Sequence, residues 1–219
     1  PQDKRSQDRE KDGSEVPGSA RRSSRTYAKA CLMELPALGR EAGVSLTAEA
    51  RHDFAVVIPA FNEVPVVPAL ISELRATFER HELSGEVLFV DDGSTDGTAD
   101  LVETEAGGWP LLKVLRHPTN LGKTEAMITA SRATERTYLV LFDADLQHLP
   151  DQIPRFLEKL HAGWDIVTGR KIGFYGKRVV SSFYNGLSRR IFRVPVSDLN
   201  SMKAFRRCIL DEISLRHDW

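Results

Sequence analysis

Two aspartates, Asp143 and Asp145, follow the apolar run 138–142 (YLVLF) with a single alanine between them. Carboxylates at the mouth of a buried strand offer hard oxygen ligands to Mg²⁺ or Mn²⁺, and such a cation can also bind phosphate oxygens. Gln147 takes the next alternate position and can face the same side. The spacing therefore favours a site for a metal and a diphosphate. A solvated cap after the strand is the alternative interpretation.

A second acidic turn, residues 91–94 (DDGS), follows the expected strand 86–90 (EVLFV). Its glycine permits a tight turn, and Ser94 or Thr95 is expected to cap the following helix. A turn with a cap does not explain Asp91, which comes directly after a strand. Its carboxylate could accept hydrogen bonds from a base N–H or a ribose hydroxyl.

A third motif, residues 56–63 (VVIPAFNE), ends another apolar run. Pro59 sets a fixed turn at the end of that strand. Glu63 could bind a ribose. Phe61 could stack on a base, and packing of its ring in the core explains it equally well.

These motifs require a scaffold that brings strand ends together. From Phe54 onward, short apolar strands alternate with helical patterns, which predicts an α/β fold with a mostly parallel sheet covered by helices on both faces. Ligands bind such sheets beyond the carboxyl ends of the strands. The expected strands are 55–59, 86–90, 111–115, 138–142 and 165–168, and the expected helices are 66–80, 96–106, 120–134 and 151–162.

The N-terminal segment, residues 1–53, differs from the rest of the chain. Residues 1–26 are polar and charged, with almost nothing to bury, which predicts disorder. Residues 28–38 (AKACLMELPAL) predict either a short helix or a loosely attached arm. We expect residues 54–219 to form the catalytic domain. Because the chain begins at Pro1 and ends abruptly at Trp219, we interpret it as truncated at the C-terminus.

Composition excludes several other functions. The net charge of −1 and the absence of a recognised binding motif argue against nucleic acid as a partner. The histidines lack zinc-binding spacing, and the two cysteines read as free thiols. No apolar run reaches the roughly 18–20 residues of a membrane span. Residues 120–124 (NLGKT) lack the first glycine of a P-loop.

The stretch 169–197 is rich in lysine and arginine and contains no acidic residue. Apolar residues recur in it at helical spacing, which predicts a basic amphipathic helix. Such a helix suits an anionic membrane surface or a phosphate-bearing acceptor. A solvated basic face over the core is the alternative.

Taken together and in this order, the motifs resemble those of family 2 glycosyltransferases with a GT-A fold. Within that family they are most similar to the group that mannosylates or glucosylates polyprenyl (dolichyl) phosphate. The resemblance runs from about Phe54 to the end of the chain and implies a GT-A, Rossmann-like α/β domain. It rests on the motifs VVIPAFNE, VDDGSTDGT, NLGK, DADLQHLP, TGR and VSDLNSMKAFRR.

The resemblance also implies roles for individual residues. Asp145, Arg170 and Asp198 would be catalytic, and Asp143, Asp145 and Gln147 would ligate or orient Mg²⁺ or Mn²⁺. Arg170 with Lys177 or Arg178 would meet phosphate groups of the donor or acceptor. The residues that would bind the nucleotide sugar are Pro59, Phe61, Glu63, Val90, Asp91, Asp92, Lys123, Asp143, Ala144 and Asp145.

The implied reaction is metal-dependent transfer of a hexose, with inversion, from a nucleotide-diphosphate sugar of the GDP-mannose or UDP-glucose type to a polyprenyl phosphate. A phosphate acceptor is largely anionic at neutral pH, so it needs positive charge rather than a general base. The expected place is the cytoplasmic side of a membrane, peripherally or through segments missing from this chain. The alternatives are transfer to a saccharide hydroxyl and a nucleotide-sugar-binding subunit without catalysis.

Overall fold

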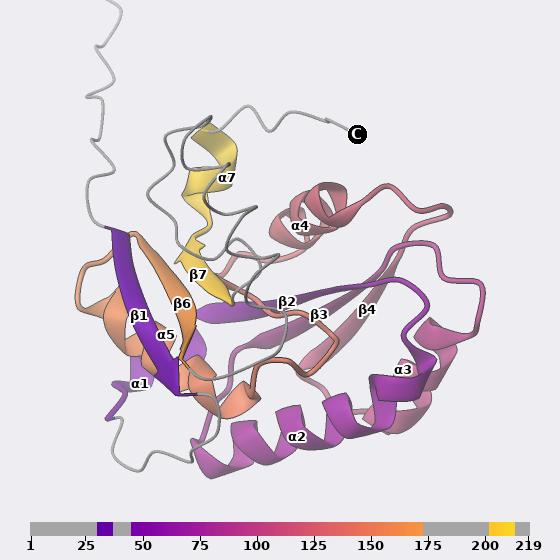
Figure 1. The fold of residues 1–219 in the computed structure, drawn as a ribbon, viewed down its shortest axis with the longest axis horizontal. Coiled ribbons are helices and arrows are strands. Elements are labelled where there is room, and N and C mark those ends of the chain that lie inside the picture. Colours follow the sequence, from indigo (N-terminus) through magenta and orange to yellow (C-terminus); the bar gives the residue numbers. More distant parts are fainter. Residues whose placement is uncertain (1–29, 37–44, 173–201, 213–219) are drawn as a thin grey trace, which may run out of the picture.

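A sheet with helices on both faces forms the centre of the molecule (Figure 1). The computed structural model describes residues 30–36, 45–172 and 202–212, with side chains for 45–169 and 202–210. Among the described residues, seven strands form one sheet in the order β1-β6-β7-β5-β2-β3-β4. The strands are β1 Ala30–Pro36, β2 Phe54–Ala60, β3 Glu86–Asp91, β4 Leu112–Arg116, β5 Tyr138–Leu141, β6 Ile166–Ile172 and β7 Lys203–Arg206.

The helices cover the two faces of this sheet unequally. Figure 1 shows α2 and α3 along one face and α4 over the other, while α5 lies beside β6. The four helices predicted between residues 54 and 168 are all present, although their ends differ by a few residues. The helices are α1 Ala48–His52, α2 Val67–Arg80, α3 Thr98–Ala106, α4 Lys123–Arg132, α5 Ile153–His161 and α7 Cys208–Glu212, with 3₁₀ turns at Val64–Val66 and Pro150–Gln152.

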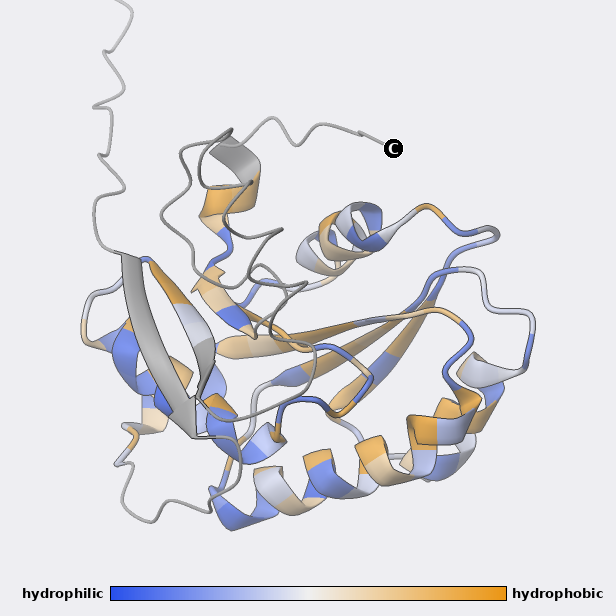
Figure 2. Cartoon of the chain, viewed as in Figure 1, coloured by the Kyte–Doolittle hydropathy of each residue, from blue (hydrophilic) through white to orange (hydrophobic). Residues whose placement is uncertain are grey.

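Strand β2 explains why the central strands are apolar throughout. It is parallel to β3 on one side and to β5 on the other. Val56 and Ile58 belong to the core cluster that includes residues of α2, whereas Ala55 and Val57 belong to the cluster that includes Ala126 of α4. Successive side chains of a strand point to opposite faces, so a strand covered on both faces must be apolar at every position. Figure 2 shows this hydrophobic centre.

Both interpretations of residues 28–38, a short helix and a loosely attached arm, were wrong for the part of this segment that the structure describes. Residues 30–36 form β1, which pairs in parallel with β6 from the Ala30–Ile166 pair to the Pro36–Ile172 pair. The segment is rich in good helix formers, but intrinsic propensity is a weak prior that sheet pairing overrides. Leu46 and Ala50 are also buried in the core. These described parts of residues 1–53 therefore join the sheet and core, where a loosely attached segment was expected.

Strand β7 and helix α7 had no counterpart in the sequence-based expectations. β7 runs antiparallel between β5 and β6, so the sheet is mostly but not wholly parallel. It is short (KAFR), and only Ala204 is buried within it, so it lacks the apolar run that marked the other strands. No helix among the described residues is long and apolar enough to cross a membrane.

His161, in the last turn of α5, predicts a pH-dependent stability. Burial lowers the pKa of its imidazole, despite the acidic Glu49 and Asp53 nearby, and within the described residues its Nε2 is buried without a hydrogen-bond partner. Below about pH 6.5, the ordinary histidine pKa, the unfolded chain therefore takes up a proton more readily than the folded chain. The free energy of unfolding should fall from that pH down to the lowered folded pKa.

Urea unfolding of the full-length protein at about pH 7.5 and about pH 5.5 checks this expectation. His161→Phe keeps a ring beside Tyr138, whose ring centroid lies 4.7 Å from that of the imidazole, but removes the titrating group. The variant should lose less stability between the two pH values than the wild type. Equal losses would show that His161 does not contribute to the pH dependence.

Candidate functional site

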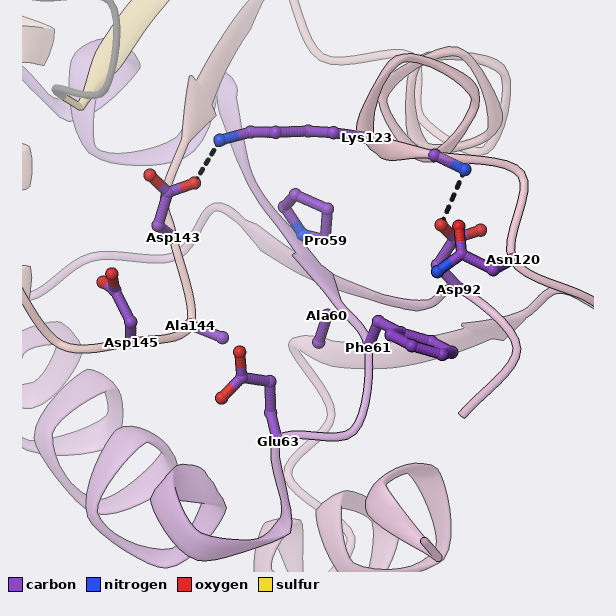
Figure 3. A pocket seen from close by; sticks show the side chains of 11 residues that line it. Pro59, Ala60, Phe61, Glu63, Asp92, Asn120, Lys123, Asp143, Ala144 and Asp145 are labelled. Carbon is purple, nitrogen blue, oxygen red and sulfur yellow. Dashed lines mark hydrogen bonds and ion pairs between the residues drawn. The ribbon is translucent and has the colours of Figure 1, made fainter. Parts of the chain in front are cut away.

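A cavity of about 340 Å³ lies at the carboxyl ends of β2, β3 and β5 (Figure 3). The parallel strands end side by side here, so loops that are far apart in the sequence meet at one edge of the sheet. The ring of Phe61 is 44% exposed at this cavity. The lining residues are Pro59, Ala60, Phe61, Glu63, Asp92, Asn120, Gly122, Lys123, Asp143, Ala144 and Asp145.

The Asp143–Asp145 turn forms one wall of the cavity. Ala144 is buried, whereas Asp145 is exposed and Asp143 is partly exposed. The side chain of Lys123 crosses the cavity from the start of α4 and forms an ion pair with Asp143 (Figure 3). Asp145 Oδ1 accepts the backbone N–H of Gln147 at 3.0 Å. The turn thus presents two carboxylates, one of which already holds a cationic group.

Glu63 places a third carboxylate on the opposite wall (Figure 3). Its backbone N–H donates to Thr98 Oγ1 at 2.8 Å, which ties the turn after β2 to the first turn of α3. Burial raises the pKa of Glu63, and the negative charges of Asp145 and Asp96 raise it further. This surplus of negative charge is the electrostatic environment in which a cation binds favourably.

The turn at residues 91–98 is held by side-chain hydrogen bonds that differ from the predicted helix cap. Neither Ser94 nor Thr95 caps α3, which begins after Gly97 without a side-chain cap. Ser94 Oγ instead accepts the backbone N–H of Asn62 at 2.9 Å, and Asn62 Oδ1 accepts the N–H of Thr95 at 2.9 Å. The expected cap was wrong because these polar side chains fasten the turn after β2 to the turn after β3.

The side chain of Asp92 is buried and held by hydrogen bonds, whereas that of Asp145 is exposed. Asp92 Oδ1 accepts the backbone N–H of Leu121 at 2.9 Å and its Oδ2 accepts that of Gly122 at 2.8 Å. His117 Nδ1 lies 2.7 Å from Oδ1. Burial alone would raise the pKa of Asp92, but these hydrogen bonds outweigh it and lower the pKa below its usual value. Asp92 is therefore ionised at neutral pH.

The predicted site residues whose side chains the structure describes fall into three groups. Most of them line the cavity together, namely Pro59, Phe61, Glu63, Asp92, Lys123, Asp143, Ala144 and Asp145. Val90 and Asp91 are buried and do not line it, although Asp91 Oδ1 has no hydrogen-bond partner among the described residues. Gln147 is exposed outside the lining.

The residues predicted to meet phosphate cannot be placed beside the cavity. Arg170 lies in β6, but its side chain is outside the described part of the chain, as are Lys177, Arg178 and Asp198 altogether. Three lining residues were not predicted as ligands from the sequence: Ala60, Asn120 and Gly122. Asn120 and Gly122 belong to the polar segment after the third expected strand, and this position at a strand end was the signal for them.

The donor set fits a hard divalent cation. Within the described residues no cluster of three His, Cys, Asp or Glu side chains is placed to hold a metal. The two aspartates of the turn would still supply carboxylate oxygens, and Mg²⁺ commonly uses only one or two carboxylates with water and phosphate oxygens. Burial raises the pKa of Glu63, and the negative charge of Asp145, which also lines the cavity, raises it further.

Gly93 permits the close approach of two loops, which leads to a prediction. Its φ is +77°, and a Cβ at this position would lie 2.4 Å from the backbone carbon of Thr119. Gly93→Ala should lower the free energy of unfolding by roughly 1–3 kcal/mol for the left-handed backbone alone, and by more for the overlap. Denaturant unfolding measures the loss.

Gly97→Ala is the matched control for Gly93→Ala. Gly97 has a similar φ of +89°, but a Cβ there meets nothing within 4 Å. The difference between the two variants therefore isolates the overlap with residues 119–120. Equal destabilisation by both variants would contradict the tight contact between these loops.

Comparison with known proteins gives three consistent results. A family model described as "Glycosyl transferase family 2" matches residues 55–208. An undecaprenyl-phosphate 4-deoxy-4-formamido-L-arabinose transferase of Aeromonas hydrophila is 32% identical over 164 residues, which cover 72% of this chain and 50% of that protein. A protein of the same name from an Enterobacter species is 33% identical over 177 residues, covering 78% and 54%.

Solved structures share the fold. The mannosyltransferase from Pyrobaculum calidifontis in complex with GDP-Man and Mn²⁺ has a TM-score of 0.57 at 25% identity, covering 76% of this chain and 48% of that one. Glucosyl-3-phosphoglycerate synthase from Mycobacterium tuberculosis, with Mn²⁺, has a TM-score of 0.56 at 24% identity, covering 73% and 58%. These similarities confirm the predicted GT-A fold class. The chain spans about half the length of the curated relatives it matches.

Proposed function

Because this chain belongs to glycosyl transferase family 2, we propose that the protein moves a sugar from a nucleoside-diphosphate sugar to a polyprenyl phosphate, with inversion. One observation carries the proposal. At the carboxyl ends of parallel strands, a single cavity brings the carboxylates of Glu63, Asp143 and Asp145 opposite the ammonium of Lys123. Such an arrangement suits a ligand that combines anionic phosphates with hydroxyl donors.

The donor would lie along the ends of β2 and β3. The half-exposed ring of Phe61 offers a flat apolar surface for a base. Glu63, with its raised pKa, would accept hydrogen bonds from ribose hydroxyls. Lys123 would pair with the diphosphate, which is the leaving group. Support for a nucleoside-diphosphate sugar comes from the related mannosyltransferase, whose structure contains GDP-Man.

Asp143 and Asp145 would hold Mg²⁺ or Mn²⁺, with Gln147 orienting Asp145 through its backbone N–H. A divalent cation at this place supplies Lewis-acid stabilisation of the charge that develops on a departing diphosphate. The presence of Mn²⁺ in the related mannosyltransferase supports this assignment. The chain's own part is to place two carboxylates in the turn that follows a buried strand.

The acceptor would be a polyprenyl phosphate at a membrane surface. Two relatives at 32% and 33% identity are named for transfer to undecaprenyl phosphate. A phosphate monoester with a second pKa near about 6 is largely anionic at neutral pH, so its oxygen attacks the anomeric carbon without a general base. The basic stretch 169–197 provides positive charge for it, with Arg170, Lys177 and Arg178 as the proposed phosphate contacts and Asp198 as a further catalytic candidate.

A transfer assay with the full-length protein tests the proposal. The protein is incubated with a panel of UDP- and GDP-linked sugars, a polyprenyl phosphate in detergent, and Mg²⁺ or Mn²⁺. A lipid-linked sugar that disappears on addition of EDTA is the expected product. The panel also identifies the sugar, since a hexose is predicted while the relatives are named for an arabinose derivative. Transfer only to saccharides, or nucleotide binding without turnover, would overturn the proposal in favour of the corresponding alternative.

A further inference from the structure

A buried network ties the end of β3 to helix α4. Asp92 receives the backbone N–H groups of Leu121 and Gly122 at 2.9 and 2.8 Å. Both donors belong to residues 117–122, which we call the β4–α4 loop. Two N–H groups that would otherwise lack partners just before a helix are thereby satisfied by one carboxylate.

His117 extends the network to the body of α4. Its Nδ1 lies 2.7 Å from Asp92 Oδ1 and its Nε2 lies 2.9 Å from Thr129 Oγ1. The side chains of His117 and Asp92 are only 7% and 6% exposed. An ionised carboxylate can only accept, so Nδ1 carries the hydrogen. The imidazole is therefore held at both nitrogens, between the strand ends and the helix.

The β4–α4 loop contributes residues to the lining of the cavity. Asn120 and Gly122 line it, and Lys123 follows at once as the first residue of α4. From there the ammonium group reaches Asp143 on the opposite wall (Figure 3). The loop is also packed tightly against Gly93, the residue after Asp92. Because Asp92 and His117 hold the loop, they also set the direction of the Lys123 side chain that follows it.

We propose that Asp92, His117 and Thr129 form a positioning network that fixes the β4–α4 loop and so aims Lys123 at the diphosphate of the donor. Asp92 is then a positioning residue and not a contact of the nucleoside, in contrast to the role that the family resemblance implies. The inference rests on the proposed function, because it presumes a nucleoside-diphosphate ligand. It adds two residues, His117 and Thr129, to those on which donor binding depends.

Three variants of the full-length protein test the network. His117→Leu removes both hydrogen bonds, Thr129→Val removes only the bond on the helix side, and His117→Asn can restore a donor to Asp92. Thr104→Val is the matched control, because Thr104 Oγ1 donates to the backbone oxygen of Asp100 within α3, away from the cavity. Thr129→Val removes a single hydroxyl and keeps the test informative even if His117→Leu does not fold.

Two measurements separate positioning from general destabilisation. Amide hydrogen exchange reports on the N–H groups of Leu121 and Gly122, which should exchange about tenfold faster in His117→Leu than in the wild type. Calorimetry with UDP and GDP in Mn²⁺ should show dissociation constants raised about tenfold, an effect that His117→Asn partly reverses. Thr129→Val should shift both readouts in the same direction, and Thr104→Val should shift neither.

The outcomes distinguish the two proposals. A wild type that binds neither UDP nor GDP would overturn the proposed function. A wild type that binds one of them, with unchanged affinity and unchanged amide exchange in His117→Leu and Thr129→Val, would overturn the positioning network alone. If the two amides instead exchanged more slowly only when nucleotide binds and responded to neither variant, that result would show that the ligand, and not the network, orders the loop. It would also overturn the network.

Discussion

Replacement of Asp145 by asparagine is expected to lower sugar transfer at least about a hundredfold while leaving the protein folded. Asparagine keeps an oxygen that can accept the backbone N–H of Gln147, as Asp145 Oδ1 does, so the turn should persist. What is lost is the negative charge of an exposed carboxylate that lies close enough to Glu63 to raise the pKa of that residue. The proposed metal would lose one of its few protein ligands.

The measurement compares transfer rate, Mn²⁺ affinity and unfolding midpoint in the full-length protein. Asp100→Asn serves as the control, because Asp100 is a highly exposed acid on α3 that pairs with Arg116 away from the cavity. We expect its transfer rate to match that of the wild type. Undiminished transfer by Asp145→Asn would remove Asp145 from the catalytic and metal-binding roles proposed for it.

The placement of the acidic turns was predictable because parallel strands leave a strong signal. Buried strands such as 56–58 and 87–90 are apolar at every position, so the polar residue that follows marks the strand end. Once the strands are known to be parallel, their ends must lie at one edge. The convergence of Glu63, Lys123 and Asp143 on a single cavity follows from that rule.

The parts that escaped prediction depend on partners distant in the sequence. β1 contains good helix formers and becomes a strand only because β6 lies beside it. β7 is too short and too polar to be recognised without β5 and β6 on its two sides. The hydrogen bonds of Asp92 to the backbone N–H groups of Leu121 and Gly122 were not predicted either. The engagement of Asp92 by residues 117–122 depends on a loop about thirty positions later in the chain, as the Asp92–Gly122 separation of 30 shows.

Lys123→Met is expected to weaken the binding of UDP or GDP on the order of fiftyfold, because a charge-assisted hydrogen bond contributes about 1.5–3 kcal/mol. The same change should leave Mn²⁺ binding in the absence of nucleotide undiminished, or strengthen it. The ammonium group of Lys123 pairs with Asp143 and would therefore compete with a metal for that carboxylate. Methionine keeps an unbranched side chain as far as Cε and removes the competing charge.

Opposite changes in the affinities for Mn²⁺ and for the nucleotide distinguish this effect from general disruption of the site. A disrupted cavity would lower the affinity for Mn²⁺ and the affinity for the nucleotide together. If Lys123 pairs with Asp143 in one state and with the diphosphate in the other, its loss lowers only the affinity for the nucleotide. Lys113→Met is the matched control: the Lys113 side chain is 53% exposed against 51% for Lys123, and it lies 3.7 Å from Glu86, outside the cavity. Calorimetry on both variants of the full-length protein, first with Mn²⁺ and then with nucleotide, measures the two dissociation constants. If Lys123→Met lost affinity for Mn²⁺ alone, the ammonium group would be supporting the metal site instead of competing for it.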